Sequence, residues 1–346
     1  MYRRLSASLL VIVLLASVAL VAGCGKPKIP GVKDGTFVGT SPLDSHGNYG
    51  IATITIENGR YKDVKYVEIN GATHQPKAAG SYQYENALQA IEQLPKTLLE
   101  KGDIDKVDVI AKATGTSNTF KAAVKSALAN ASATAKTGMA DGTYELTGPT
   151  THNNYPKIKV TISGGQITAV EYNEYMADTN KTKAEANYPH KPAVDAIAQL
   201  PAKFMETKDL SKVDTVAGAT HTSNTFKDMV QTIMWLAAAK DGVYEVKGQP
   251  DAHGNQAVGK LVINNHKIID AAYDEIVVAK NLSKTDPNSG YTYPDAINVL
   301  KVLGGNMVKY QYTEGALAAV DATAKATGTK TSFKATMEQL LQAAGK

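Results

Sequence analysis

The sequence comprises 346 residues, with 37 lysine and arginine side chains against 33 aspartate and glutamate side chains and a formal net charge of +4. No basic cluster with interleaved aromatic residues occurs, which excludes the usual signature of a nucleic-acid-binding protein. Cys24 is the only cysteine, so intramolecular disulfides, cysteine-ligated zinc sites and iron–sulfur clusters are excluded as well.

Residues 1–23 resemble a lipoprotein signal peptide. Two arginines precede an apolar run that ends at Val21, and this run is short for a membrane-spanning helix, which needs about 20 residues. The segment VAGC that ends at Cys24 resembles a lipobox. We therefore expect cleavage before Cys24, acylation of that residue (a palmitate-type anchor), and residues 24–33 as a spacer at the extracellular face of the cell membrane, favoured as a Gram-positive surface. An uncleaved anchor or an ordinary signal peptide is the alternative.

Strand patterns recur three times along the chain. Each copy opens with Asp-Gly, at Asp34, Asp141 and Asp241. Alternating apolar residues then surround a two-residue turn, at Asn58-Gly59, at Gly164-Gly165 and near Asn264-Asn265. Alternation around a tight turn is typical of antiparallel hairpins with one buried face.

Two helical patterns follow the strands in each copy. The first copy reads YENALQAIEQLPKTLLEK, in which apolar residues recur at spacings of three and four. Pro95 and Pro201 predict that the first helix of copies one and two is interrupted or ends there, because proline lacks the N–H group. The last helix of each copy carries an apolar stripe that begins at Phe120, Phe226 and Phe333.

The fold class that these patterns predict is α+β, with three tandem repeats of a small domain that combines an antiparallel sheet with helices. Each domain would contain about 100 residues, a common size for a small domain. The predicted boundaries are 34–130, 141–239 and 241–346. A linker of small and polar residues separates the first two domains.

A seven-residue motif precedes the last helix of every copy: AKATGTS from Ala111, AGATHTS from Ala217 and AKATGTK from Ala324. In each copy a threonine stands just ahead of the helix: Thr114, Thr220 and Thr327. Ser117 and Ser223 are candidates for the helix N-cap. Small residues around a hydroxyl allow a bulky group to approach, and free N–H groups at a helix start suit a phosphate. The residues alone predict a phosphate-bearing ligand near a helix N-terminus.

The stretch Asp214-x-x-Ala217-Gly218-Ala219-Thr220 resembles the flavinylation motif Asp-x-x-(Ser/Thr)-Gly-Ala-(Thr/Ser) of the FMN-binding domain family. That family includes flavin-bearing subunits of sodium-pumping quinone reductases and Rnf complexes, and flavinylated lipoproteins of extracellular electron transfer. In the family, a flavin transferase moves FMN from FAD onto the last threonine as a phosphodiester. The resemblance covers the chain from Asp34 to its C-terminus, and the lipobox with tandem copies is most similar to the electron-transfer lipoproteins.

The resemblance implies covalent FMN on up to three threonines, Thr114, Thr220 and Thr327. The other site positions that it implies are Asp108, Asp214, Asp321, Ala113, Gly218, Ala219 and Ala326. The motif departs from the family pattern in all three copies at Ala111, Ala217 and Ala324, where serine or threonine is usual, and in two copies at Lys112 and Lys325, which replace the glycine. A lysine is costly there if the turn needs a positive φ, although its cation could instead lie beside the FMN phosphate. The alternative is that the threonines only cap helices.

The function that the resemblance implies is electron transfer, not enzymatic turnover. Electrons would come from a membrane NADH dehydrogenase or quinol system and pass to external acceptors such as ferric iron or soluble flavins. The alternatives are a ligand-binding lipoprotein of a transport system and a flavin-dependent extracellular reductase. No nucleophile–base pair or phosphate loop favours hydrolysis or group transfer, and no metal site is expected.

Three further sets of residues recur at equivalent positions. The histidines His46, His152 and His253 could lie beside the flavin ring, but a polar turn is the favoured interpretation. Tyr66, Tyr172 and Tyr273 could stack on the flavin, but packing is favoured for these strand residues. The glutamates that follow them, Glu68, Glu174 and Glu275, are expected to be solvated.

Overall fold

The computed structural model describes residues 27–134, 138–320 and 325–345. The expected signal peptide, Cys24 and Asp321 therefore lie outside the described residues. The described chain is a mixed α+β protein with three antiparallel sheets and seven α-helices. None of the helices within these ranges is both long and apolar enough to cross a membrane.

The first unit, residues 35–131, is a sheet with strand order β1-β2-β3-β4 and two helices. Its elements are β1 (Gly35–Thr40), β2 (Tyr49–Glu57), β3 (Arg60–Asn70), β4 (Gln75–Pro76), α1 (Glu85–Lys101) and α2 (Thr114–Ala131). Helix α2 packs on β1 and β2, while α1 packs on β3. Alternate strand residues such as Ala52 and Ile54 are fully buried beneath the helices, which confirms the predicted hairpin with one buried face.

The second unit, residues 142–238, repeats this order with the sheet β5-β6-β7. Its elements are β5 (Gly142–Thr147), β6 (Asn154–Ser163), β7 (Gln166–Met176), α3 (Lys191–Thr207) and α4 (Thr220–Ala238). Helix α3 packs on β7 and α4 packs on β5 and β6, as α1 and α2 do in the first unit. Phe204 and Phe226 meet edge to face in the core between the two helices.

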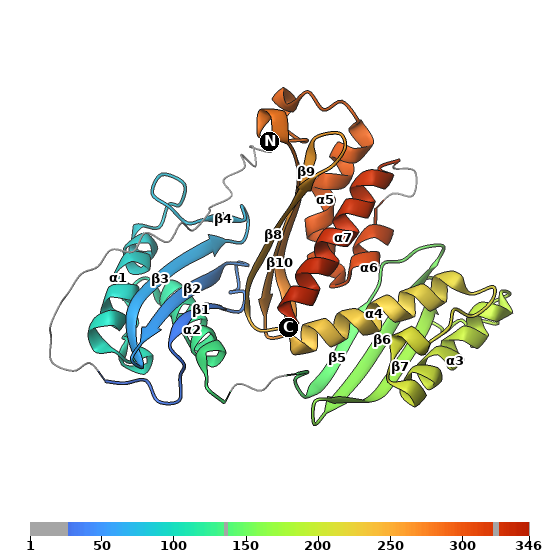
Figure 1. The fold of residues 1–346 in the computed structure, drawn as a ribbon, viewed down its shortest axis with the longest axis horizontal. Coiled ribbons are helices and arrows are strands. Elements are labelled where there is room, and N and C mark those ends of the chain that lie inside the picture. Colours follow the sequence, from blue (N-terminus) through green and yellow to red (C-terminus); the bar gives the residue numbers. More distant parts are fainter. Residues whose placement is uncertain (1–26, 135–137, 321–324, 346) are drawn as a thin grey trace.

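The third unit, residues 242–344, has the sheet order β11-β10-β9-β8 and one additional short helix. Its elements are β8 (Gly242–Pro250), β9 (Asn255–Asn264), β10 (Lys267–Val277), β11 (Leu282–Ser283), α5 (Pro294–Tyr310), α6 (Thr313–Ala318) and α7 (Thr327–Ala344). Although it is last in the sequence, this unit lies between the first and the second (Figure 1).

The predicted hairpin turns are confirmed in the first two units. Asn58-Gly59 has φ values of 54° and 70°, and Gly164-Gly165 has values of 60° and 73°. Positive φ at both central residues matches the mirror-image turn whose twist suits a hairpin. In the third unit the turn lies one residue later than predicted, at Asn265-His266.

The aspartate that opens each unit holds the hairpin turn of that unit. Asp34 accepts hydrogen bonds from the backbone N–H groups of Asn58 (2.8 Å) and Gly59 (2.9 Å). Asp141 accepts from Gly165 at 2.8 Å in the same way. These bonds tie the start of the first strand to the far turn, which gives the repeated Asp-Gly opening a structural role.

The prediction that prolines interrupt the first helices is wrong. Helix α1 continues through Pro95 to Lys101, and α3 continues through Pro201 to Thr207. Proline removes one helical hydrogen bond, but residues on both sides of it are anchored to the sheet. In α1, Leu94 and Leu98 are almost completely buried. Tertiary packing therefore outweighs the lost hydrogen bond.

The third unit shares buried contacts with both neighbours. Tyr49 of β2 donates a 2.6 Å hydrogen bond to Asp270 of β10, and His74 lies 3.2 Å from the same carboxylate. On the other side, Tyr312, just before α6, is buried in the core of the second unit. The backbone N–H of Glu314 donates to Asp228 of α4 at 3.1 Å. The third unit therefore joins the other two through contacts to which each unit contributes side chains.

Candidate functional site

The three motif threonines occupy the same structural position. Thr114, Thr220 and Thr327 are the first residues of α2, α4 and α7, and all three are exposed. The N-cap residues before them are the buried alanines Ala113, Ala219 and Ala326, which make no side-chain cap. The first N–H groups of a helix have no partner inside it, so an uncapped start attracts an anion.

The prediction that Ser117 and Ser223 are N-caps is wrong, because both helices begin three residues earlier. Each serine is fully buried in the first turn. The Ser117 hydroxyl donates to the carbonyl of Ala113 (2.9 Å) and accepts from the N–H of Ile110 (3.1 Å). Ser223 makes the equivalent pair of bonds. These serines fix the loop that presents the threonine instead of satisfying the helix start.

The loop before the threonine is a tight turn in the first two units. Lys112 and Gly218 occupy equivalent positions with φ values of 62° and 75°. The glycine of the motif therefore meets a conformational need, and Lys112 adopts the same left-handed conformation at a steric cost. In the third unit Lys330 replaces the bracing serine, and residues 321–324 of the equivalent loop lie outside the described ranges.

We expect Gly218→Ala to lower the free energy of unfolding by about 1–2 kcal/mol, because an L-residue is strained at this φ. The new Cβ would also lie 3.2 Å from a Pro192 side-chain atom. Scanning calorimetry of the chain measures the loss. The matched control is Lys112→Gly, which relieves strain but adds unfolded-state entropy, and we expect it to stay within about 0.5 kcal/mol of the parent. Equal losses of unfolding free energy for Gly218→Ala and Lys112→Gly would contradict the claim that the positive φ of this turn strains an L-residue.

In the second and third units, a second helix start lies beside the threonine loop. The ring nitrogen Nε2 of His190, the N-cap of α3, is 2.6 Å from the carbonyl oxygen of Gly218. In the third unit the N–H of Lys325 lies 3.4 Å from Asp295 in the first turn of α5. The N-caps of α1 and α5 are Tyr84 and Tyr293, and neither makes a side-chain cap. In the second and third units two uncapped helix N-termini therefore converge, which strengthens the positive potential around Thr220 and Thr327.

A buried ion pair lies at the same end of each sheet. Its members are Glu68 with Lys77 at 2.7 Å, Glu174 with Lys183, and Glu275 with Lys284. The carboxylates are only 1%, 2% and 4% exposed, so the expectation that these glutamates are solvated is wrong. Each lysine ammonium also lies over a tyrosine ring, 4.4–4.5 Å from the centroid of Tyr82, Tyr188 or Tyr291. The pair and the ring compensate each buried charge.

In the third unit the buried pair contacts the first turn of the threonine helix. In the third unit Thr329, two residues after Thr327, lies 3.3 Å from Glu275 Oε2, and Tyr273 donates to Oε1 at 2.9 Å. In the first unit Tyr66 bonds instead to Thr119 of α2 at 2.7 Å. Glu68 Oε2 then has no hydrogen-bond partner among the described residues. The carboxylate therefore helps to hold the helix start in the third unit, where it reaches Thr329.

The strand tyrosines pack in the core, which confirms the favoured interpretation. Tyr66, Tyr172 and Tyr273 meet Phe120, Phe226 and Phe333 edge to face, with centroids 5.0–5.3 Å apart. Burial and the neighbouring Glu174 raise the pKa of Tyr172 well above its ordinary value. A phenol that stays neutral can donate to the buried carboxylate throughout the physiological range.

The two motif aspartates that the structure describes, Asp108 and Asp214, make no hydrogen bond to the threonines. Asp108 pairs with Lys101 at 2.7 Å, at the end of α1 away from Tyr84, and this contact lowers its pKa. Asp214 is exposed and lines a groove of about 570 Å³ between the second half of α3 and residues 213–217. Ala217 also lines the groove. This face of the motif is open to a second protein.

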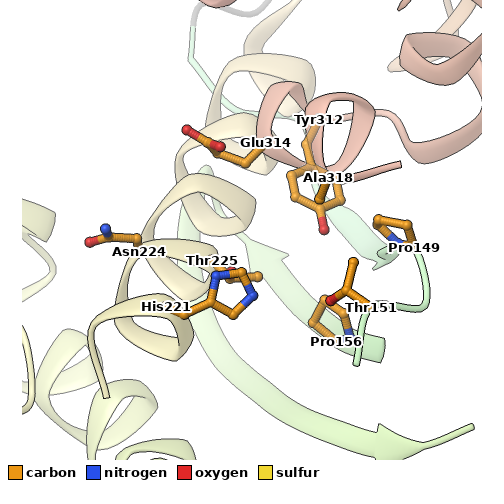
Figure 2. A pocket seen from close by; sticks show the side chains of 9 residues that line it. All are labelled: Pro149, Thr151, Pro156, His221, Asn224, Thr225, Tyr312, Glu314 and Ala318. Carbon is orange, nitrogen blue, oxygen red and sulfur yellow. The ribbon is translucent and has the colours of Figure 1, made fainter. Parts of the chain in front are cut away.

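Figure 2 shows a smaller pocket of about 140 Å³ between the second and third units. His221, next to Thr220, lines it together with Thr151, Tyr312 and Glu314. Its volume is below the range of about 300–1,000 Å³ that small-molecule sites usually occupy, so it cannot enclose a flavin ring. Throughout the described ranges, no group of three or more His, Cys, Asp or Glu side chains could hold a metal ion.

The repeated histidines lie in exposed polar turns, as the favoured interpretation predicted. Asp44 accepts from the backbone N–H groups of His46 (2.7 Å) and Asn48 (2.8 Å). Asp251 closes the turn of His253 in the same way. The histidine backbone therefore has a structural role in these two turns.

Comparison with known proteins identifies one family. The model of the FMN-binding domain matches residues 31–129 and 153–234, which include Thr114 and Thr220. Comparison with curated proteins gives no match. Among solved structures, the chain is similar to the CPE2226 protein from Clostridium perfringens, with 28% identity over 29% of this chain and 88% of that chain and a TM-score of 0.26.

The residues at the helix starts fit FMN. An exposed hydroxyl and uncapped N–H groups suit the phosphate, because both hydrogen bonding and the helix dipole favour a negative charge there. The positions after Thr114 and Thr327 are Gly115 and Gly328, and a Cβ built at either would meet no atom within 4 Å. The space beside these two threonines is thus open to a bulky ligand.

Proposed function

The chain belongs to the FMN-binding domain family, and from this premise we propose that it is an electron carrier with covalently attached FMN. Its family makes it a flavoprotein. The proposal assigns up to three attachment sites, Thr114, Thr220 and Thr327. The observation that carries it is the repeated helix start, where an exposed threonine hydroxyl follows a buried alanine that leaves the first N–H groups free.

In the attachment step, the threonine Oγ forms a bond to the FMN phosphorus of FAD. The pyrophosphate bridge of FAD breaks, AMP leaves, and the hydroxyl proton is released. A flavin transferase would catalyse this step, and the exposed face of the motif around Asp214 supports access by such an enzyme. The resulting diester keeps a negative charge beside the N–H groups of the helix start, which stabilise it.

The three units correspond to three tandem FMN-binding domains, residues 34–130, 141–239 and 241–346. The family model does not extend to the third. Its inclusion is supported by the same order of hairpin and helices, the N-cap Ala326 and the buried pair of Glu275 and Lys284. FMN supplies the redox chemistry when bound, and the chain supplies placement.

The proposed location is the extracellular face of the cell membrane, with an acyl anchor on Cys24. A membrane NADH dehydrogenase or quinol system would donate electrons, and ferric iron or soluble flavins would accept them. Covalent attachment suits this location, because a dissociable flavin would be lost by dilution outside the cell. The lipobox-like sequence and the motif resemblance support this part of the proposal.

Intact-mass spectrometry of the chain, produced together with a flavin transferase, tests the attachment. We expect each of Thr114→Ala, Thr220→Ala and Thr327→Ala to remove one FMN increment and the triple variant to carry none. The matched control is Thr215→Ala, an exposed threonine of the same loop, which should retain every increment. Unmodified peptide at all three positions of the parent would contradict the proposal.

A further inference from the structure

Each unit presents an exposed ring at the N-cap of its first helix. The rings are Tyr84 of the first unit, His190 of the second and Tyr293 of the third. Tyr84 is 59% exposed and Tyr293 is 68% exposed. These fractions are larger than those of the other exposed large hydrophobic residues in the described ranges. The same position is thus occupied by a ring that faces solvent in all three units.

Helix stability does not explain these rings. An N-cap position favours Ser, Thr, Asp or Asn, whose side chains bond to the first N–H groups. Tyr84, His190 and Tyr293 make no such bond. Three helices of one chain therefore replace a stabilising cap with an exposed ring, which points to a role in binding.

In the second and third units the helix starts that carry the rings lie beside the threonine loops. His190 is 2.6 Å from the carbonyl oxygen of Gly218, two residues before Thr220. In the third unit, Asp295 in the first turn of α5 reaches the backbone of Lys325, two residues before Thr327. The rings and the attachment positions therefore share one end of these two units, and the same order of strands and helices extends this placement to Tyr84 of the first unit.

The two tyrosines are backed by a second ring. Tyr82 lies 5.5 Å from Tyr84, and Tyr291 lies 5.4 Å from Tyr293. The backing rings are half-buried and contact the ammonium groups of the buried pairs. Tyr84 and Tyr293 are therefore held against a fixed support while one side of each remains accessible.

We propose that Tyr84, His190 and Tyr293 are the platforms on which the isoalloxazine rings of the attached FMN groups stack. This inference rests on the proposed attachment at the neighbouring threonines. An aromatic ring system stacks on another through dispersion and burial of apolar surface. The ribityl chain lets the isoalloxazine fold back from the diester onto the adjacent helix start.

The platforms make the second site different from the other two. The flavins on Thr114 and Thr327 stack on a phenol, which quenches flavin fluorescence by electron transfer. The flavin on Thr220 stacks on an imidazole, a weaker electron donor. The flavin on Thr220 is therefore expected to fluoresce more strongly than the other two.

Single-flavin proteins test the assignment. The variant Thr220→Ala/Thr327→Ala carries flavin on Thr114 alone, and its fluorescence is measured per flavin absorbance. Adding Tyr84→Phe, which keeps the ring but removes the electron-rich phenol, should raise the fluorescence about fivefold. The factor follows because only a flavin stacked on the phenol is quenched. At the weak end of base–aromatic stacking, about five flavins are stacked for each one that is not. In the Thr220-only protein, His190→Tyr should lower the fluorescence by a similar factor.

The controls separate this inference from the proposed function. Tyr84→Phe in the Thr220-only protein should leave the fluorescence unchanged, because the flavin lies in another unit. Unchanged fluorescence in both test proteins, with the FMN mass present, would overturn the platforms and leave the proposed function standing. If none of the single-threonine proteins carries flavin, both the platforms and the proposed function are overturned.

Discussion

Replacing Lys183 with methionine is expected to lower the free energy of unfolding by about 3–5 kcal/mol. The substitution leaves Glu174 buried without its cation, and only the Tyr172 hydroxyl remains as a donor to that carboxylate. An uncompensated buried charge carries most of this cost. Urea unfolding followed by the fluorescence of Trp235, the single tryptophan and a residue of α4, measures the loss.

Two comparisons isolate the charge. The double variant Glu174→Gln/Lys183→Met removes both charges and keeps an acceptor for Tyr172, so it should recover at least half of the lost stability. Lys159→Met breaks an exposed cross-strand pair with Glu171 in the same unit and should cost less than about 1 kcal/mol. Equal losses of unfolding free energy for Lys183→Met and Lys159→Met would show that burial of the Glu174–Lys183 pair adds nothing to the cost of breaking it.

The elements that the sequence predicted are those set by local patterns. Asn58-Gly59 and Gly164-Gly165 define their turns because few residues adopt positive φ there. The continuation of α1 through Pro95 was not predictable in this way, because it depends on how Leu94 and Leu98 pack against the sheet. The position of the third unit between its neighbours depends on contacts such as Tyr49 with Asp270, which join distant segments.

The candidate site was predicted in part. The threonines lie at helix starts as the small-residue motif predicted, but the buried pair of Glu68 and Lys77 was missed. A signal for it exists, since a lysine follows the glutamate by nine residues in every unit. Alternation alone does not reveal it, because a charged residue at a strand position is usually solvated. The rings at Tyr84 and His190 were missed because N-cap assignment needs the helix start itself.

The largest pH effect is expected from Asp228, where α4 meets the third unit. The pKa of Asp228 is raised from 3.8 to about 7, chiefly by burial. Repulsion from Glu314 and Glu338 acts in the same direction, whereas the N–H of Glu314 and Lys334 oppose the rise. A folded-state pKa above the unfolded value stabilises the protein fully below pH 4, and this contribution is lost as the pH rises through 7. The loss amounts to about 4 kcal/mol by proton linkage.

Asp228→Asn should remove this dependence, because the amide oxygen still accepts from the N–H of Glu314 but carries no charge. At pH 8 the variant is expected to be more stable than the parent by up to about 4 kcal/mol, and below pH 4 the two should be equal. Trp235 fluorescence in urea at a series of pH values measures both. Asp195→Asn on α3 removes an exposed carboxylate and should follow the parent profile. Parallel profiles for Asp228→Asn and the parent would mean that Asp228 stays ionised in the folded chain, with Lys334 and the Glu314 N–H outweighing its burial.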